Sequence, residues 1–302
     1  MNDHVTLLDV TTRDGLQDEP RFVRTESKVR IVEALANAGI TEIEVTSFVH
    51  PKWVPQLADA DTLIGLLPRS VRYSVLIMND KGFDRALAAF DGAGFERGSY
   101  DLVFVGSASP RHNKSNNNRT IPETLAYFDT VAARAKAENV TIRAAIACSF
   151  ASPWADEKLE LDTVLEMAQR LEQGGCHMIS LADTIGKATP EIICETTSAV
   201  RARTSVPLSL HLHDLRGSAL PNVEAGLECG IRRFEGVLAG IGGCPFAPEA
   251  PGNLDLERLA DYVAARGFST GTHAEQLAQA RAVLEAALAA AEPLNRPAHA
   301  FA

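Results

Sequence analysis

The chain lacks the features of a membrane protein or a secreted one. Its 302 residues contain no run of about eighteen consecutive apolar residues, the length that a membrane-spanning helix needs. The N-terminal segment MNDHVTLLDV has no basic stretch followed by an apolar one, so it does not resemble a signal peptide. We therefore predict a soluble, cytoplasmic protein that has no membrane partner.

Cysteine is scarce, and the five cysteines form no recognisable pattern. Their number is odd, they are widely scattered, and no two of them are spaced as CxxC. This argues against a disulfide framework and against a zinc knuckle. We predict that all five are thiols: Cys148, Cys176, Cys194, Cys229 and Cys244.

Positive charge is also in short supply. Lysine and arginine number 29 against 39 aspartates and glutamates, which gives a formal net charge of -10. No basic stripe alternates with the aromatic residues, which make up only 6% of the chain. Both features argue against nucleic acid as a partner, and an anionic ligand would need local cationic groups.

What the chain does have is eight short apolar runs rich in β-branched residues, which predict strands. They cover residues 6–12, 42–47, 72–78, 100–107, 141–150, 177–184, 208–214 and 233–240. Between them lie amphipathic stretches such as 28–39 and 164–175, whose apolar residues recur every three or four positions and which end on glycine. These stretches predict helices.

The strand starts recur every 25 to 41 residues, and strands that alternate with helices on this scale indicate parallel βαβ units. Eight such units predict an α/β fold of the (β/α)8 TIM barrel class. A doubly wound open sheet is the alternative, but no GxGxxG follows the first strand. We expect a single catalytic domain over residues 1–302, with the barrel at about 5–265 and additional C-terminal helices at about 266–302.

Residues 106–120 form a polar, asparagine-rich segment after the fourth predicted strand. Barrels place active-site loops at this position, so the segment could line the mouth of a site. Asparagine also favours turns, and a solvated loop is therefore the other interpretation.

Unusual polar residues gather at the C-terminal ends of the predicted strands, the catalytic face of a barrel. They are Arg13, Asp14, Glu44, Ser47, Asp183, His211, His213, Asp214, Cys244 and Asn253. His211 and His213 are two apart on a strand, so both imidazoles project to one face. With a carboxylate from Asp14 and a carbonyl from Asn253 they would form a site with two open positions, which suits Mg²⁺ or Mn²⁺. A structural role for the histidines and a turn-capping role for Asp14 are the alternatives.

The charged and reactive residues next to this set have two interpretations each. Arg13 could neutralise an oxyanion on a thioester carbonyl or form a surface salt bridge. Glu44 and Asp183 lie in apolar strands, so each needs a cationic partner or water, and we favour supporting roles in the site. In the loop 240–253, glycines before Cys244 and prolines after it indicate a hinged flap, whereas a buried, inert cysteine is the alternative.

Together these residues resemble those of the 3-hydroxy-3-methylglutaryl-CoA lyase family, within the metal-dependent lyase and synthase TIM barrels. The resemblance runs nearly end to end and is carried by TTRDGLQDEP (11–20), EVTSFVHPKWVPQLAD (44–59), SLADTIGKATP (180–190), HLHD (211–214) and GIGGCPFAPEAPGN (240–253). It implies a lyase that cleaves 3-hydroxy-3-methylglutaryl-CoA to acetyl-CoA and acetoacetate, in leucine degradation and ketone body formation. The extra C-terminal helices and the habit of the family lead us to expect a homodimer.

The resemblance also implies roles for individual residues. The metal ligands would be Asp14, His211, His213 and Asn253. The catalytic residues would be Arg13, Glu44, Asp183, His211 and Cys244. The residues in contact with the substrate would be Arg13, Gln17, Ser47, Ser180 and Asn295.

The implied reaction is a metal-assisted retro-Claisen cleavage of an acyl-CoA substrate. Metal coordination acidifies the tertiary hydroxyl, the alkoxide collapses to a ketone, and the departing carbon becomes an acetyl-CoA enolate that Arg13 stabilises. His211, Asp14 and Glu44 are all candidates for the base. Cys244 would either return a proton to the enolate or seal the site.

Several positions depart from the family pattern and bear on specificity: Leu215, Arg216, Glu235 and Pro297. They keep open a lyase for another 3-hydroxy-3-alkylglutaryl-CoA or for a citramalyl-type CoA ester. A Claisen-condensing synthase of the same superfamily is a further alternative, although GGCPFAP resembles the lyases. A metal-binding barrel without activity is the remaining one, and the retention of ligands, Arg13 and Cys244 together argues against it.

Overall fold

Eight parallel strands close into a barrel, in the order β1-β3-β4-β5-β6-β7-β8-β9. The computed structural model describes residues 4–243 and 251–294. The barrel strands are β1 Thr6–Asp9, β3 Glu42–Ser47, β4 Arg72–Ile77, β5 Tyr100–Ser107, β6 Thr141–Ala147, β7 Met178–Asp183, β8 Leu208–Leu212 and β9 Arg233–Gly236. Each lies inside one of the eight predicted runs, so the predicted (β/α)8 barrel is confirmed.

The strands form because their β-branched and apolar side chains are buried on both faces, as is usual for parallel sheets. All six residues of β7 are buried. Pairing between β5 and β6 is regular, from Asp101 opposite Thr141 to Ser107 opposite Ala147. Between β3 and β4 the register shifts between Glu44 and Thr46, and such irregularities can re-aim side chains near active sites.

Helices alternate with the strands, and side-chain caps explain where several of them begin. The Asn79 side chain accepts from Gly82 N at the start of α3, and Thr120 and Glu123 form a capping box at the start of α5. The helices are α1 Thr25–Asn37, α2 Ala60–Leu66, α3 Asp80–Gly92, α4 Pro110–Asn117, α5 Ile121–Ala137, α6 Leu161–Gln173, α7 Pro190–Arg201, α8 Ala219–Glu228, α9 Leu256–Ala264 and α10 Ala274–Ala289.

Three short turns and two short strands complete the described chain. The turns are η1 Thr11–Gly15, η2 Pro55–Leu57 and η3 Leu238–Gly240. The strands β2 Arg21–Phe22 and β10 Glu292–Pro293 pair antiparallel. Sequence analysis predicted neither strand, because two residues carry no periodicity.

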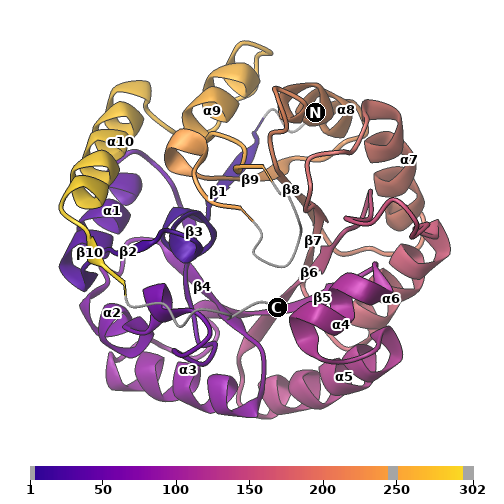
Figure 1. The fold of residues 1–302 in the computed structure, drawn as a ribbon, viewed down its shortest axis with the longest axis horizontal. Helices are drawn as coiled ribbons and strands as arrows, with labels where there is room; N and C mark the ends of the chain where they lie inside the picture. Colours follow the sequence, from indigo (N-terminus) through magenta and orange to yellow (C-terminus); the bar gives the residue numbers. More distant parts are fainter. Residues whose placement is uncertain (1–3, 244–250, 295–302) are drawn as a thin grey trace. The chain divides into compact units, whose positions relative to one another are not determined.

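The described residues divide into two compact units. The first contains residues 4–100, 235–243 and 252–294. In this unit the C-terminal helix α10 packs against α1, beside which it is drawn in Figure 1. The buried side chains of α10 include Leu277 and Leu284. The additional C-terminal helices predicted from the sequence are therefore present, and α10 covers α1.

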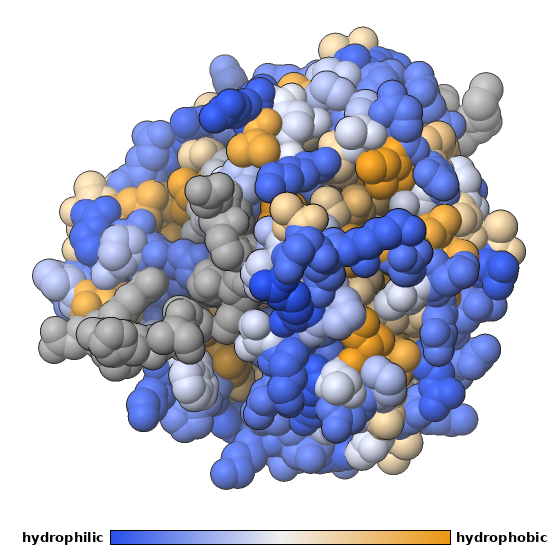
Figure 2. Space-filling view, turned by 45° about the vertical axis from the view of Figure 1, so that its right-hand side comes forward, coloured by the Kyte–Doolittle hydropathy of each residue, from blue (hydrophilic) through white to orange (hydrophobic). Residues whose placement is uncertain are grey.

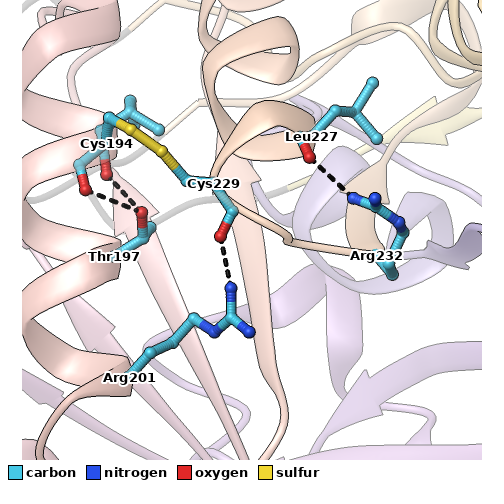
Figure 3. The surroundings of a disulfide bond; sticks show 7 residues. Cys194, Thr197, Arg201, Leu227, Cys229 and Arg232 are labelled. Atoms are coloured by element: carbon cyan, nitrogen blue, oxygen red, sulfur yellow. Dashed lines mark hydrogen bonds between the residues drawn. A yellow bond between two sulfur atoms is a disulfide. The ribbon is translucent and has the colours of Figure 1, made fainter. Parts of the chain in front are cut away.

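The second unit contains Asp101–Phe234 together with Pro251. In it α7 packs against α8, and Cys194 of α7 forms a disulfide with Cys229, the residue that follows α8 (Figure 3). The Cα atoms of the two cysteines are 5.7 Å apart, within the range that a disulfide spans. The prediction of thiols is wrong for these two residues, because helix packing brings together cysteines that are 35 residues apart. Cys148 and Cys176 are buried thiols.

The asparagine-rich segment 106–120 contains helix α4, so its interpretation as a solvated loop is wrong for Pro110–Asn117. Ser109 caps this helix by accepting from His112 N. Asn113 is buried and makes side-chain hydrogen bonds that a turn residue would not make. Its Oδ1 accepts from Ser107 N at 3.0 Å, and its Nδ2 donates to Thr124 Oγ1 at 2.8 Å.

No helix within residues 4–243 and 251–294 is both long enough and apolar enough to cross a membrane. On the face drawn in Figure 2, hydrophilic residues prevail and apolar residues form smaller groups among them. Among the described residues, Trp53 and Leu66 are the large apolar side chains that are exposed.

Candidate metal and active site

The turn η1, directly after β1, carries two of the predicted site residues, Arg13 and Asp14. It is π-helical, because the Val10 carbonyl accepts from Gly15 N, five residues further on, at 3.1 Å. A Cβ atom at Gly15 would lie 2.7 Å from the Val237 side chain, so the turn fits here only with glycine at this position. Single π-helical turns occur often at functional sites.

Arg13 lies between two carboxylates of the same unit. Its Nε donates to Glu44 Oε1 at 2.5 Å, and its Nη1 donates to Asp14 Oδ1. Burial disfavours the charged guanidinium, but the carboxylates of Glu44 and Asp14, with a smaller contribution from Glu235, outweigh burial and raise the pKa of Arg13. The expected cationic partner of Glu44 is therefore Arg13, and this pair is not a surface salt bridge because Glu44 is buried.

Asn253 ties Asp14 to the segment that follows β9. Its Nδ2 donates to Asp14 Oδ2 at 3.0 Å and to the Ile241 carbonyl at 3.0 Å. Gly242 has φ +95°, and a Cβ atom there would lie 2.8 Å from the Asp14 carbonyl oxygen. Because the amide nitrogen of Asn253 is used in these bonds, its Oδ1 is the atom that can serve as a ligand.

In the other unit, the imidazoles of His211 and His213 converge. Their Nε2 atoms are 3.2 Å apart, and both residues are buried. His213 Nδ1 lies 2.8 Å from the Pro251 carbonyl. A carbonyl only accepts, so Nδ1 carries the proton and Nε2 of a neutral His213 is the unprotonated nitrogen. A metal-binding histidine typically donates a hydrogen bond from the ring nitrogen that does not bind the metal, as His213 Nδ1 does here.

Asp14 of the first unit and His211 and His213 of the second all carry side-chain atoms of the kinds that bind metal ions. The donors fit a divalent cation, since His213 offers an unprotonated nitrogen, Asp14 a carboxylate and Asn253 a carbonyl oxygen. Such mixed nitrogen and oxygen donors suit several divalent cations, and oxygen donors favour Mg²⁺ and Mn²⁺ among them.

The carboxylate of Asp183, at the end of β7, accepts hydrogen bonds from backbone amides. It accepts from Lys187 N at 3.1 Å and from Ala188 N at 3.0 Å. Burial raises the pKa of Asp183 to about 6, although these amides, the amide of Gly186 and the charge of His211 all act in the opposite direction. The turn that follows β7 therefore supplies hydrogen-bond donors to Asp183, in addition to the cationic charge of His211.

A comparison with protein families decides the relationship. The HMGL-like family matches residues 4–284. The chain belongs to the HMGL-like family. A mitochondrial hydroxymethylglutaryl-CoA lyase of Bos taurus is 38% identical over 287 residues, which are 94% of this chain and 86% of the bovine protein. A hydroxymethylglutaryl-CoA lyase of Bacillus subtilis is 35% identical over 284 residues, 93% of this chain and 92% of the bacterial one.

A solved structure agrees with this family membership. An HMG-CoA lyase from Acinetobacter baumannii, in complex with coenzyme A and 3-methylmalate, matches this HMGL-like chain with a TM-score of 0.87 at 34% identity. The match covers 97% of this chain and 94% of that chain. The resemblance to HMG-CoA lyases inferred from the sequence motifs is confirmed.

The remaining predicted site residues of this HMGL-like protein are placed as follows. Ser47 is buried, and its Oγ accepts from Val49 N at 3.1 Å. Ser180 is also buried, and its Oγ has no hydrogen-bond partner among the described residues. Gln17 is partly exposed at the end of the turn that begins with η1. Cys244 and Asn295 lie outside the described residues.

The departures from the family pattern have different surroundings. Arg216 is exposed with φ 58°, in a left-handed turn, and Leu215 is partly exposed. Glu235 is buried on β9 and belongs to the carboxylates that raise the pKa of Arg13. Glu235 therefore adds to the negative charge around the Arg13 guanidinium. Pro297 lies outside the described residues.

Two polar residues near Arg13 and Asp14, namely Asp9 and Thr11, were not predicted from the sequence. Both are fully buried, and the Asp9 carboxylate accepts from Thr11. The signal was present in the sequence, since an aspartate inside an otherwise apolar strand is costly to bury without partners.

Proposed function

We propose that this member of the HMGL-like family is a carbon-carbon lyase that cleaves 3-hydroxy-3-methylglutaryl-CoA into acetyl-CoA and acetoacetate. The two lyases aligned above cover most of the chain, which supports this assignment. Within the molecule, the observation that carries the proposal is Arg13 held between Glu44 and Asp14. Cleavage next to a thioester carbonyl places negative charge on the carbonyl oxygen, and the fixed guanidinium of Arg13 beside a candidate metal ligand is suited to stabilise that charge.

We propose that Asp14, His211, His213 and Asn253 hold the cation, Mg²⁺ or Mn²⁺. When bound, a divalent cation supplies Lewis acidity toward the hydroxyl oxygen of the substrate. His213 is prepared for binding by its bond to the Pro251 carbonyl, which keeps Nε2 unprotonated. Asn253 is prepared because its amide nitrogen donates to Asp14 and Ile241.

Arg13 would bind the thioester carbonyl oxygen and stabilise the negative charge that develops there as the carbon-carbon bond breaks. Glu44 holds Nε of the guanidinium and so directs its other N–H groups. Because Glu44 is engaged in this way, we propose that it positions Arg13 and that the base is His211 or Asp14. Asp183 would support the site through the turn whose amides it accepts from.

We propose that Gln17, Ser47 and Ser180 contact the acyl group. The observation in favour of Ser180 is its buried hydroxyl without a partner among the described residues, because such a group gains a hydrogen bond when a substrate oxygen arrives. For Cys244 as the thiol of a flap and for Asn295 as a contact to the substrate, the support is the sequence resemblance alone.

We further propose one catalytic domain, an acyl-CoA substrate, a homodimer and a cytoplasmic location, with a place in leucine degradation and ketone body formation. The likeness to a lyase in complex with coenzyme A supports the acyl-CoA substrate. Nucleic acid and membranes are not proposed as partners.

The test is turnover of the purified protein with Mn²⁺ and 3-hydroxy-3-methylglutaryl-CoA, with products identified by mass spectrometry. We expect acetyl-CoA and acetoacetate in equal amounts. Longer 3-alkyl analogues and citramalyl-CoA belong in the same panel, because Leu215 and Arg216 depart from the family pattern. Products from an analogue alone would shift the proposal to that ester, and no cleavage across the whole panel would overturn it.

A further inference from the structure

Asp9 and Thr11 are joined by two hydrogen bonds in the interior of the first unit. Asp9 ends β1, and Thr11 begins η1. The Asp9 carboxylate accepts from Thr11 N at 2.9 Å and from the Thr11 hydroxyl at 2.5 Å. Both residues have no exposed surface, so water does not compete for these bonds.

The Thr11 hydroxyl makes a second bond, to a distant part of the chain. It accepts from Leu238 N at 2.9 Å, at the start of η3. A hydroxyl has one proton, and here that proton is given to Asp9, so its lone pairs face Leu238. Asp9 therefore fixes the direction in which Thr11 can accept, and Thr11 fixes η1 against η3.

The two segments joined in this way carry candidate ligands. The turn η1 holds Asp14, and the segment after η3 reaches Ile241, whose carbonyl accepts from Asn253. The same Asn253 nitrogen donates to Asp14. Two links therefore connect η1 with the segment after β9: one through Thr11 and Leu238, the other through Asp14 and Asn253.

We propose that Asp9 and Thr11 are positioning residues that set the orientation of Asp14 and Asn253 as ligands of the divalent cation. The inference rests on the proposed function, because it takes these two residues to be ligands. Residues that are hydrogen-bonded to metal ligands commonly fix the orientation of those ligands and tune the affinity for the metal. Neither Asp9 nor Thr11 would touch the substrate.

Packing alone does not explain a carboxylate at position 9. Burial raises the pKa of Asp9 to about 7, although the hydroxyl and amide of Thr11 act against this rise. An apolar residue of similar volume would avoid the desolvation of a carboxylate. The presence of aspartate is explained if its bonds to Thr11 serve the orientation of η1.

The test compares Thr11→Val, Thr11→Ser and Asp9→Asn at pH 8. Valine keeps the volume of threonine but can neither donate to Asp9 nor accept from Leu238, whereas serine keeps the hydroxyl. Thr197→Val is the matched control, because Thr197 is also fully buried and its hydroxyl donates to Ile193 O of its own helix. The affinity for Mn²⁺ is measured by titration calorimetry without substrate, and kcat and KM are measured separately.

We expect Thr11→Val to weaken Mn²⁺ binding and to lower kcat by about 10- to 100-fold each, with KM changed little. Thr11→Ser should restore both values to within about threefold, and Asp9→Asn should lie between the two. Thr197→Val should lower the unfolding temperature without changing either value.

An Mn²⁺ affinity and a kcat of folded Thr11→Val that equal those of Thr197→Val would overturn the proposal. If Thr11→Val does not fold, the same comparison with Asp9→Asn decides the question. A wild-type protein that binds Mn²⁺ but cleaves none of the esters would refute the proposed reaction and not this inference, because the calorimetric comparison needs no turnover.

Discussion

The guanidinium of Arg13 donates from Nε to Glu44 Oε1 across 2.5 Å, and Glu44 is almost completely buried. A second bond joins Nη1 of Arg13 to Asp14. An arginine has about five N–H donors, so this double pairing still leaves donors for a substrate oxygen. The two carboxylates hold the guanidinium in place. Less reorganisation of the site is therefore needed when negative charge develops on the substrate.

Replacing Arg13 by glutamine should nearly abolish turnover while Mn²⁺ binding is retained. We expect kcat to fall about 1,000-fold, because the charge that faces the thioester oxygen is lost. Lysine at this position keeps the charge but cannot donate to Glu44 and Asp14 in the same geometry, so Arg13→Lys should recover only part of the activity. Steady-state kinetics and Mn²⁺ calorimetry on both variants check this. Near-normal turnover of Arg13→Gln would refute the assigned role.

Removal of the metal should stop turnover, and loss of His213 should mimic removal. We expect chelation by EDTA to abolish activity and added Mn²⁺ to restore it. His213→Ala should weaken Mn²⁺ binding by more than about 100-fold, because it removes a metal ligand rather than a residue that is hydrogen-bonded to a ligand. His177→Ala is the control, since His177 pairs with Asp101 and is not part of the candidate metal group. Equal Mn²⁺ affinity in the two variants would contradict the ligand set.

The barrel and the strand-end residues could be predicted because both follow from local patterns. Each strand is a short β-branched run, and parallel strands bring their C-terminal ends to one face of a barrel. The position of Arg13 and Asp14 after β1 could therefore be derived without any knowledge of their partners. Pairing was predictable for Glu44, because a buried carboxylate at this position needs a cation.

Other features depend on contacts between distant residues and could not be derived. Thr11 and Leu238 are 227 positions apart, and no pattern in the sequence connects them. The same holds for Cys194 and Cys229, which only helix packing brings together. Helix α4 was missed because asparagine is a weak helix former, yet Asn113 is satisfied by bonds to neighbouring segments.

Replacing Ser180 by alanine should weaken substrate binding without destabilising the protein. A buried hydroxyl without a partner costs free energy in the absence of substrate, so its removal should leave stability unchanged or slightly higher. We expect KM to rise by about fivefold, the effect of one lost hydrogen bond of about 1 kcal/mol. Ser149→Ala is the contrasting variant, because the Ser149 hydroxyl donates to Ile146 O at 2.6 Å and its loss should be destabilising. An unchanged KM would remove Ser180 from the site.

Reduction of the Cys194–Cys229 disulfide should lower stability and leave kcat unchanged. The bridge closes a loop of 35 residues, for which chain entropy gives roughly 4 kcal/mol of stabilisation. Urea unfolding with and without dithiothreitol measures this difference. Cys194→Ser should unfold at the same urea concentration under both conditions, which controls for effects of the reductant elsewhere. Two additional reactive thiols in the untreated wild-type protein would contradict the bridge.

Asp9 should make the stability of the wild-type protein fall between about pH 4 and pH 7. Burial raises its pKa to about 7 in the folded protein, against about 3.9 in an unfolded chain. Between these values the folded protein binds a proton that the unfolded chain has released, so the free energy of unfolding decreases as the pH rises. Asp9→Asn cannot titrate, and its stability relative to wild type should therefore rise by roughly 4 kcal/mol across this range and stay constant above it.

Urea unfolding of the metal-free proteins at several pH values tests this expectation, with Thr197→Val as a variant whose effect should not depend on pH. A constant difference between Asp9→Asn and wild type from pH 4 to pH 8 would contradict the raised pKa. A rising difference would show that Asp9 costs stability at neutral pH. Asp9 would then destabilise the fold although it bonds to the turn that carries Arg13 and Asp14. Positioning of that turn explains such a residue better than packing does.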